Sequence, residues 1–223
     1  MAKQKKVMES EVIADGITRD CNTFEAWFIE NGKTVAWACV AIIVIVAVVF
    51  SVIQIRKSAE AKAYSVLSSA VTEQQIQDAL KQYPKGTAAA EARFRLAGLI
   101  QAKDSKAAIE QLALVADDAD AMPFTRARAI LDAGYLYEKD GKTKDALSRY
   151  EKAASDLLLP EDARLEGYYA AGRMQLLLKD VAKARAAFRQ ASNATVRSQG
   201  AFFWSSQAKA ALNRLPAETA AAK

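Results

Sequence analysis

The sequence predicts an all-α protein in which one membrane-spanning helix precedes a solenoid of helical hairpins. Three observations predict this class. The run from Thr34 to Ile55 carries no charged side chain. From Ser58 onward the helix-favouring residues Ala, Leu, Glu, Lys, Gln and Arg dominate, without strand-like alternation. A short Ala-Gly pattern then recurs three times at nearly constant spacing, which is typical of repeat proteins.

The N-terminal tail, predicted over positions 1–33, ends in an aromatic segment. Phe24, Trp27 and Phe28 stand at i, i+3 and i+4, so they share one face of a short helix. We expect this face to lie at the lipid headgroups, and a docking site for a membrane partner is the alternative. Asn31-Gly32 is predicted to break the helix before the span.

Residues 34–55 are predicted to cross the membrane as one helix. At ~1.5 Å per residue they extend ~33 Å, which exceeds a ~30 Å hydrocarbon core. Lys33 lies at one end and Arg56 with Lys57 at the other, while Trp37 fits an interfacial anchor. A signal peptide is disfavoured because the apolar run is long and begins only after the tail. Basic residues near the span do not decide its orientation.

The recurring pattern is a large apolar residue, two variable positions and Ala-Gly. It ends at Gly98, Gly134 and Gly172, which are nearly evenly spaced. A second pattern follows the last two glycines at identical offsets, and follows the first glycine slightly sooner. Its members are Ala108, Leu112 and Val115, then Ala146, Tyr150 and Ala153, then Ala184, Phe188 and Ala191.

Both ends of the repeats are predicted to be closed by helices that lack the Ala-Gly signature. Residues 59–71 and 73–82 form a pair before the first repeat. Residues 201–212 form a last helix, which we expect to cover the open end with Phe202, Phe203 and Trp204. The repeat domain is thus predicted over residues 58–215, with a disordered tail over 216–223.

These spacings resemble the tetratricopeptide repeat (TPR) family, whose period is about 34 residues. The middle repeat fits best, whereas Gln101 and Gln175 stand where that family usually has Tyr. In the family, the first helix of each repeat lines a concave groove. The resemblance predicts a groove that binds a segment of another protein, because arginine takes carboxylates and tyrosine adds contact area; simple solvation or packing of these residues is the alternative. The residues are Arg95, Leu99, Arg128, Leu131, Tyr135, Tyr169 and Arg173.

The order of parts narrows the resemblance. A tail ending in Phe28-Ile-Glu-Asn-Gly-Lys33, one span and TPR-like repeats are similar to the bacterial YfgM family of membrane-anchored TPR proteins. That resemblance implies a single-pass inner-membrane protein with its N-terminus in the cytoplasm and its repeats in the periplasm. It also implies an ancillary role at the Sec translocon, linking it to periplasmic chaperones or emerging clients. A structural subunit of another membrane complex, bound through the span and the aromatic segment, is the alternative.

Composition disfavours other classes of function. The chain has no histidine, and its two cysteines, Cys21 and Cys39, both precede the repeats. Asp117, Asp118 and Asp120 are expected to be solvated, because no partnered nucleophile, phosphate loop or metal set accompanies them. The net charge of +5 arises in the last third and is diluted by acidic residues. We therefore expect no enzyme, no cofactor, no metal, no small-molecule substrate and no nucleic acid, but protein partners and a membrane.

Overall fold

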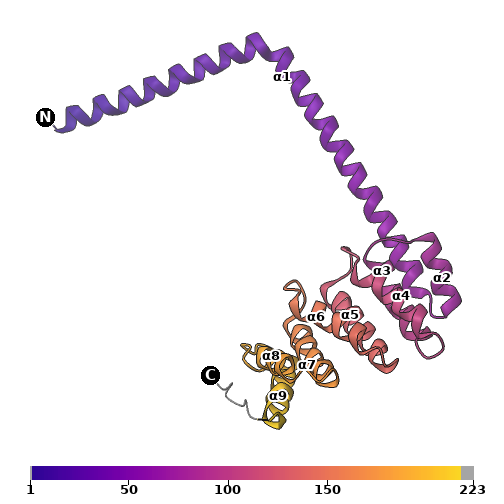
Figure 1. The fold of residues 1–223 in the computed structure, drawn as a ribbon. Coiled ribbons are helices and arrows are strands. Elements are labelled where there is room, and N and C mark those ends of the chain that lie inside the picture. Colours follow the sequence, from indigo (N-terminus) through magenta and orange to yellow (C-terminus); the bar gives the residue numbers. More distant parts are fainter. Residues whose placement is uncertain (1, 217–223) are drawn as a thin grey trace. The chain divides into compact units, whose positions relative to one another are not determined.

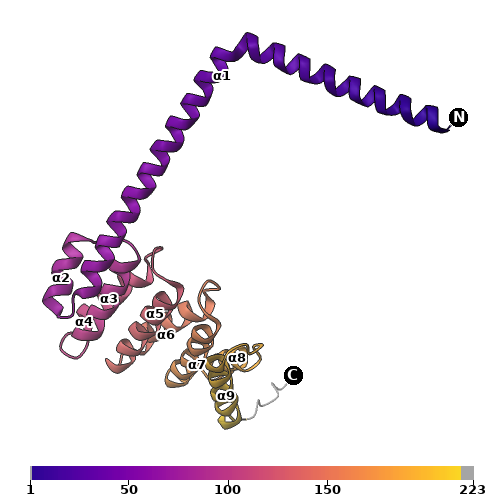
Figure 2. The same ribbon diagram turned by 180° about the vertical axis from the view of Figure 1, so that it is seen from behind.

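The computed structural model describes residues 2–216, with side chains from Glu25 onward. This part of the chain contains nine helices and no strand (Figures 1 and 2), so the predicted all-α class is confirmed for it. The chain divides into two compact units, one up to Ala59 and one from Glu60. The predicted disordered tail lies outside the described residues, apart from Pro216.

The first unit contains most of α1 (Ala2–Ser69), which is long and apolar. By length and composition, the part of α1 from Glu25 to Ser69 is the one candidate membrane span among the described residues. Along its apolar stretch the large aliphatic side chains, such as Ile43 and Ile45, are exposed, whereas Leu67 near its end is buried in a core cluster. The Oγ of Ser51 donates a hydrogen bond to the carbonyl of Ala47 at 2.8 Å, so this hydroxyl is satisfied within the helix.

The predicted helix break at Asn31-Gly32 is wrong, because α1 continues through both residues. The Asn31 Nδ2 donates to the carbonyl of Trp27 at 3.0 Å, one turn earlier, so its side chain follows the helix instead of ending it. A glycine inside a helix costs only about 1 kcal/mol relative to alanine. Helical residues on both sides outweigh that cost, since propagation of a helix is far easier than nucleation.

The second unit is a succession of antiparallel neighbours (Figure 1), in which each helix from α2 onward packs on the next. In addition α3 contacts α5, α5 contacts α7 and α7 contacts α9, whereas α4, α6 and α8 do not contact one another. The row of α3, α5, α7 and α9 is therefore the closely spaced side of the stack. The bounds are α2 (Glu73–Gln82), α3 (Thr87–Ile100), α4 (Ser105–Ala116), α5 (Pro123–Lys139), α6 (Thr143–Ser155), α7 (Glu161–Leu177), α8 (Val181–Ser192) and α9 (Gln199–Arg214).

The turns that close two of the hairpins have the same geometry. Between α5 and α6, Gly141 has φ +72°, and between α7 and α8, Lys179 has φ +63°. The next residue in each turn donates its N–H five positions back, from Lys142 to Tyr137 and from Asp180 to Gln175, both at 2.9 Å. The two turns recur at the repeat interval that also separates the two buried helix glycines. One turn geometry thus recurs even where lysine replaces the favourable glycine.

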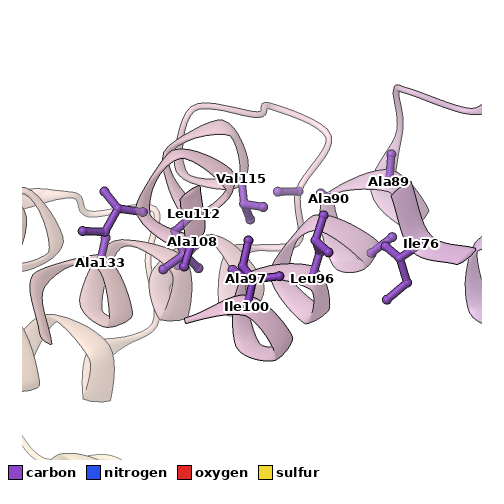
Figure 3. Packing of buried hydrophobic residues seen from close by; sticks show 14 of the residues in the cluster. Ile76, Ala89, Ala90, Leu96, Ala97, Ile100, Ala108, Leu112, Val115 and Ala133 are labelled. Atoms are coloured by element: carbon purple, nitrogen blue, oxygen red, sulfur yellow. The ribbon is translucent and has the colours of Figure 1, made fainter. Parts of the chain in front are cut away.

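The hairpins are held by large side chains packed on small ones. Tyr150 and Phe188 are fully buried. A Cβ on Gly134 would lie 2.5 Å from the Tyr150 ring, and a Cβ on Gly172 would lie 2.5 Å from the Phe188 ring. In the first hairpin Leu112 is buried instead of an aromatic residue, within a cluster shared by the end of α1 and by α2, α3, α4 and α5 (Figure 3). The second and third hairpins are therefore built on the same ring-on-glycine contact.

The expectation that three aromatic residues of α9 cover the open end is wrong for two of them. Phe202 is 65 % exposed and Phe203 50 % exposed, while Ala201 is fully buried. Because successive residues of a helix point about 100° apart, the face that packs on the stack cannot also hold Phe202. Trp204 alone turns inward, with its ring centroid 5.6 Å from that of Tyr169.

Candidate functional site: the inner face of α3, α5 and α7

The seven predicted groove residues lie on the three helices of the closely spaced row. Arg95 and Leu99 are on α3; Arg128, Leu131 and Tyr135 are on α5; Tyr169 and Arg173 are on α7. The inner face here means the side of these helices that carries Arg95, Arg128 and Arg173. Each of these three guanidinium groups is bonded within the chain.

Arg128 is the centre of the first polar cluster. Its Nη1 donates to both carboxylate oxygens of Glu166 on α7, at 3.1 and 3.0 Å, and its Nη2 pairs with Asp132 one turn along α5. The Tyr135 Oη donates to the same Glu166 at 2.8 Å. Glu166 is only 6 % exposed, so its charge is held by protein donors and hardly by water. The cluster therefore joins α5 to α7.

Burial and pairing act against each other on the pKa values of this cluster. Burial lowers the pKa of Arg128, but the Asp132 and Glu166 carboxylates outweigh it and the net pKa is raised. For Asp132, burial dominates and raises the pKa although Arg128 opposes it. Burial, with Glu166 next, raises the pKa of the Tyr135 hydroxyl far above its usual value. Tyr135 thus stays a hydrogen-bond donor at any physiological pH.

Glu138 organises a second cluster across three helices. Its Oε1 pairs with the guanidinium of Arg173 on α7, and its Oε2 accepts a hydrogen bond from the Tyr150 Oη on α6 at 2.9 Å. Tyr150 is the same side chain whose ring packs on Gly134. Burial, followed by Glu138, raises the pKa of this hydroxyl far above its usual value. The ring is therefore fixed at one end by packing and at the other by a charge-assisted hydrogen bond.

Two of the predicted groove residues have other roles in the structure. Arg95 donates to the carbonyls of Leu67 and Ala70, so it caps the carboxyl end of α1, where a cation is favourable. Leu131 is fully buried in the core of the second hairpin, and its assignment to a groove is wrong.

The remaining predicted residues are at least partly accessible. Leu99 is 50 % exposed on α3. Tyr169 is half-buried between two rings, with its centroid 5.8 Å from that of Phe188 and 5.6 Å from that of Trp204. Arg173 lies over the Tyr169 ring at 6.0 Å as well as pairing with Glu138. Each of the three arginines on the inner face thus already donates at least one hydrogen bond within the chain.

The acidic half of the inner face was missing from the sequence prediction. Glu166 follows Arg128 at the same interval that separates Gly134 and Gly172, so it occupies the same register one repeat later. That spacing places opposite charges on neighbouring helices, and it could have indicated the pair. Asp132 stands four residues after Arg128 on α5, a spacing at which opposite charges pair, so it too could have been identified as a partner. Glu138 had no such signal, because carboxylates on a helix surface are more often solvated.

The residues predicted to lie at the membrane interface are on α1. Trp27 is 51 % exposed, Phe28 47 % and Trp37 75 %, while the side chain of Phe24 lies outside the described residues. Large apolar exposure on this scale is unfavourable in water and suits a lipid or protein environment.

Comparisons with known proteins do not assign the chain to a family. No protein-family model matches the sequence, and no curated protein sequence matches it closely enough to indicate a relative. Among the described residues, no group of three or more His, Cys, Asp or Glu side chains could hold a metal ion.

Proposed function

We propose that this chain is a single-pass, membrane-anchored scaffold of TPR-like repeats that binds other proteins beside the bilayer. The observation that carries the proposal is the repeated ring-on-glycine contact in the hairpins α5–α6 and α7–α8. Tyr150 and Phe188 each follow the glycine that they cover at the same spacing. Stacked hairpins of this kind expose one side of every unit, and repeat proteins use such extended surfaces for binding.

The candidate span gives the scaffold its place. An apolar helix of this length, exposed along nearly its whole apolar stretch, is suited to lipid. A stack on the same chain is then kept near any membrane complex that the span also touches, so two weak contacts can act together. The proposal assigns the chain no catalytic role.

The resemblance to the YfgM family supports a more particular form of the proposal. In that form the complex is the Sec translocon of the bacterial inner membrane. The N-terminus is cytoplasmic, and the repeats meet chaperones or emerging chains in the periplasm. Protease treatment of spheroplasts that carry a C-terminal tag tests the topology. Digestion of the tag from outside is expected, and protection until lysis would contradict the periplasmic assignment.

Site-specific photo-cross-linking of the full chain in the membrane tests the protein-binding role. A photoreactive amino acid replaces Leu99 on the inner face or, as the matched control, Leu114 on α4, whose exposures are 50 % and 54 %. A discrete cross-linked partner from position 99, absent from position 114, is expected. Equal cross-linking from both positions, or none from position 99, would show that the inner face is not the binding surface.

One observation favours the second candidate, a structural subunit that binds through α1. Arg128 and Arg173 are already paired within the stack, so the inner face holds fewer free charges than a peptide clamp would. Trp27 and Trp37, in contrast, are exposed. Truncation after Lys57 separates the candidates. If the truncated chain still co-purifies with the membrane partner, α1 carries that contact and the repeats do not.

A further inference from the structure

The last helix, α9, occupies the position of the first helix of a fourth hairpin. It packs on α8 and on α7, as α7 packs on α6 and α5. The buried positions agree in register, since the three members of each set keep the same spacing from one helix to the next. They are Ala129, Ala133 and Leu136 on α5, then Gly167, Ala171 and Met174 on α7, then Ala201, Ser205 and Ala208 on α9.

The same register identifies which side of α9 is uncovered. Gly134 and Gly172 are buried under rings from α6 and α8, whereas the corresponding Ser206 is exposed. One turn earlier, Ile130 is fully buried on α5, but the corresponding Phe202 on α9 is 65 % exposed. No helix of the described chain lies on this side of α9, which sits at the end of the row in Figures 1 and 2.

The uncovered side of α9 keeps the residue types that stand at the same register on α7. On α7 they are Tyr168 and Gly172, an aromatic residue and a small one, and Gly172 lies under the Phe188 ring of α8. On α9 they are Phe202 and Ser206, and Lys209 follows one turn later. A lipid-binding helix needs a continuous apolar face, which this order interrupts after one turn. An aromatic ring followed one turn later by a small residue is instead the surface on which the second helix of a hairpin packs, because the small residue lets the two helices approach closely.

The charges carried by the α9 segment itself select the partner. Residues 193–216 contain Arg197, Lys209 and Arg214, all exposed, and no Asp or Glu. A second copy of the same surface would bring like charges together, which opposes self-association. A helix with acidic flanks would complement them.

We infer that the face of α9 from Phe202 to Lys209 binds an acidic amphipathic helix of a partner protein, in the position that α6 and α8 take against α5 and α7. This inference rests on the proposal that the stack is a protein-binding scaffold, and it names the kind of partner segment. The incoming helix places a large apolar side chain over Ser206, as Phe188 lies over Gly172. Phe202 and Phe203 then lose their contact with solvent.

The probe is a capped, fluorescently labelled peptide with the sequence of α8, Val181–Ser192. It carries Lys183→Glu, Arg185→Glu and Arg189→Glu, and it retains the stripe that α8 buries, Ala184, Phe188 and Ala191. Control peptides are the unaltered α8 sequence and the acidic peptide with Phe188→Ser. Binding to the full chain in micelles of a neutral detergent is measured by fluorescence anisotropy.

Saturable binding of the acidic peptide is expected. The double change Phe202→Ala with Phe203→Ala should weaken it at least about tenfold, because aromatic anchors dominate such contacts. Ser206→Gln should also weaken it by bulk alone. Phe124→Ala on α5 is the matched control, since Phe124 is 63 % exposed, and it should leave binding within about twofold. Both control peptides should bind more weakly, and salt should weaken the acidic peptide.

Three outcomes would overturn the inference: no binding of the acidic peptide, equal loss with Phe124→Ala and with the α9 change, or equal binding of the Phe188→Ser peptide. Light scattering that shows a dimer dependent on Phe202 would assign the face to a second copy. Flotation with anionic vesicles that depends on Phe202, without peptide binding, would assign it to lipid. The cross-linking experiment at position 99 does not involve α9. If the acidic peptide does not bind but position 99 still gives a cross-linked partner, the scaffold proposal stands and only this inference is wrong.

Discussion

The replacement of Gly134 with alanine is expected to destabilise the stack, although alanine is the better helix former. The added Cβ would lie 2.5 Å from Cε1 of Tyr150, about 0.9 Å short of the 3.4 Å at which ordinary contact begins. The ring cannot swing away freely, because its hydroxyl is bonded to Glu138. Overpacking of a core costs about 1–3 kcal/mol, and the gain in helix propensity offsets about 0.5–1 kcal/mol. The net loss should be about 1 kcal/mol, within limits of about 0 and 2.5 kcal/mol.

The chain supplies its own control at the same register. A Cβ on Gly98 would meet nothing within 4 Å, so Gly98→Ala should stabilise by about 0.5–1 kcal/mol through helix propensity alone. Gly172→Ala should fall between the two, because the Phe188 ring has no hydroxyl to hold it in place. Urea unfolding of the full chain in micelles, followed by far-UV circular dichroism, measures all three. If Gly134→Ala raised the midpoint as Gly98→Ala does, the close approach of α5 and α6 would be refuted.

Three further predictions concern the polar groups. Glu166→Ala should lower the free energy of unfolding in urea by about 1–3 kcal/mol, because the half-buried guanidinium of Arg128 keeps only one carboxylate partner. The control Glu110→Ala, at an exposed position of α4, should change it by no more than about 0.5 kcal/mol. Equal effects of the two changes would contradict the α5–α7 pairing. The raised pKa values of Tyr135 and Tyr150 predict stability that is fully present below pH ~10, the unfolded value, and falls above it, because only the unfolded state then loses the protons. Changing both to Phe should flatten the fall in the urea midpoint above pH ~10, and an unchanged slope would exclude them as its source. Thr72→Ala removes the capping box of α2 and should lower the free energy of unfolding by about 1 kcal/mol, measured from the same urea midpoint. An unchanged midpoint would show that this cap does not stabilise the fold.

Local pattern was sufficient for much of the fold. Residues 34–55 could be recognised because a charge-free apolar run reflects composition and length, which do not depend on packing. Tyr150 and Phe188 follow Gly134 and Gly172 at the same spacing, and both rings are buried, because equal spacing on equal helices gives equal contacts. The predicted helix break at Gly32 was wrong because it rested on the preference of one residue. That preference is weak when long helical segments lie on both sides.

The candidate site was less predictable, because it depends on which side chains meet across repeats. Sequence identified Arg128 and Arg173 as groove residues but not the carboxylates that neutralise them, Glu166 and Glu138. These partners are far away in the chain and become neighbours only when α5 and α7 pack together. Leu131 was assigned to the groove although it is fully buried, because the repeat register alone does not distinguish an accessible position of a helix from a packed one.

The sequence by itself determined that the chain is helical, that one segment suits a membrane and that hairpins repeat at nearly constant spacing. Each of these is a property of residues close together in the chain or of their periodic recurrence. Only the tertiary structure decided which charges are paired and which side of α9 is left uncovered. Both depend on the angle at which helices distant in sequence pack, and that angle is set by the summed contacts of small and large side chains, not by any one of them.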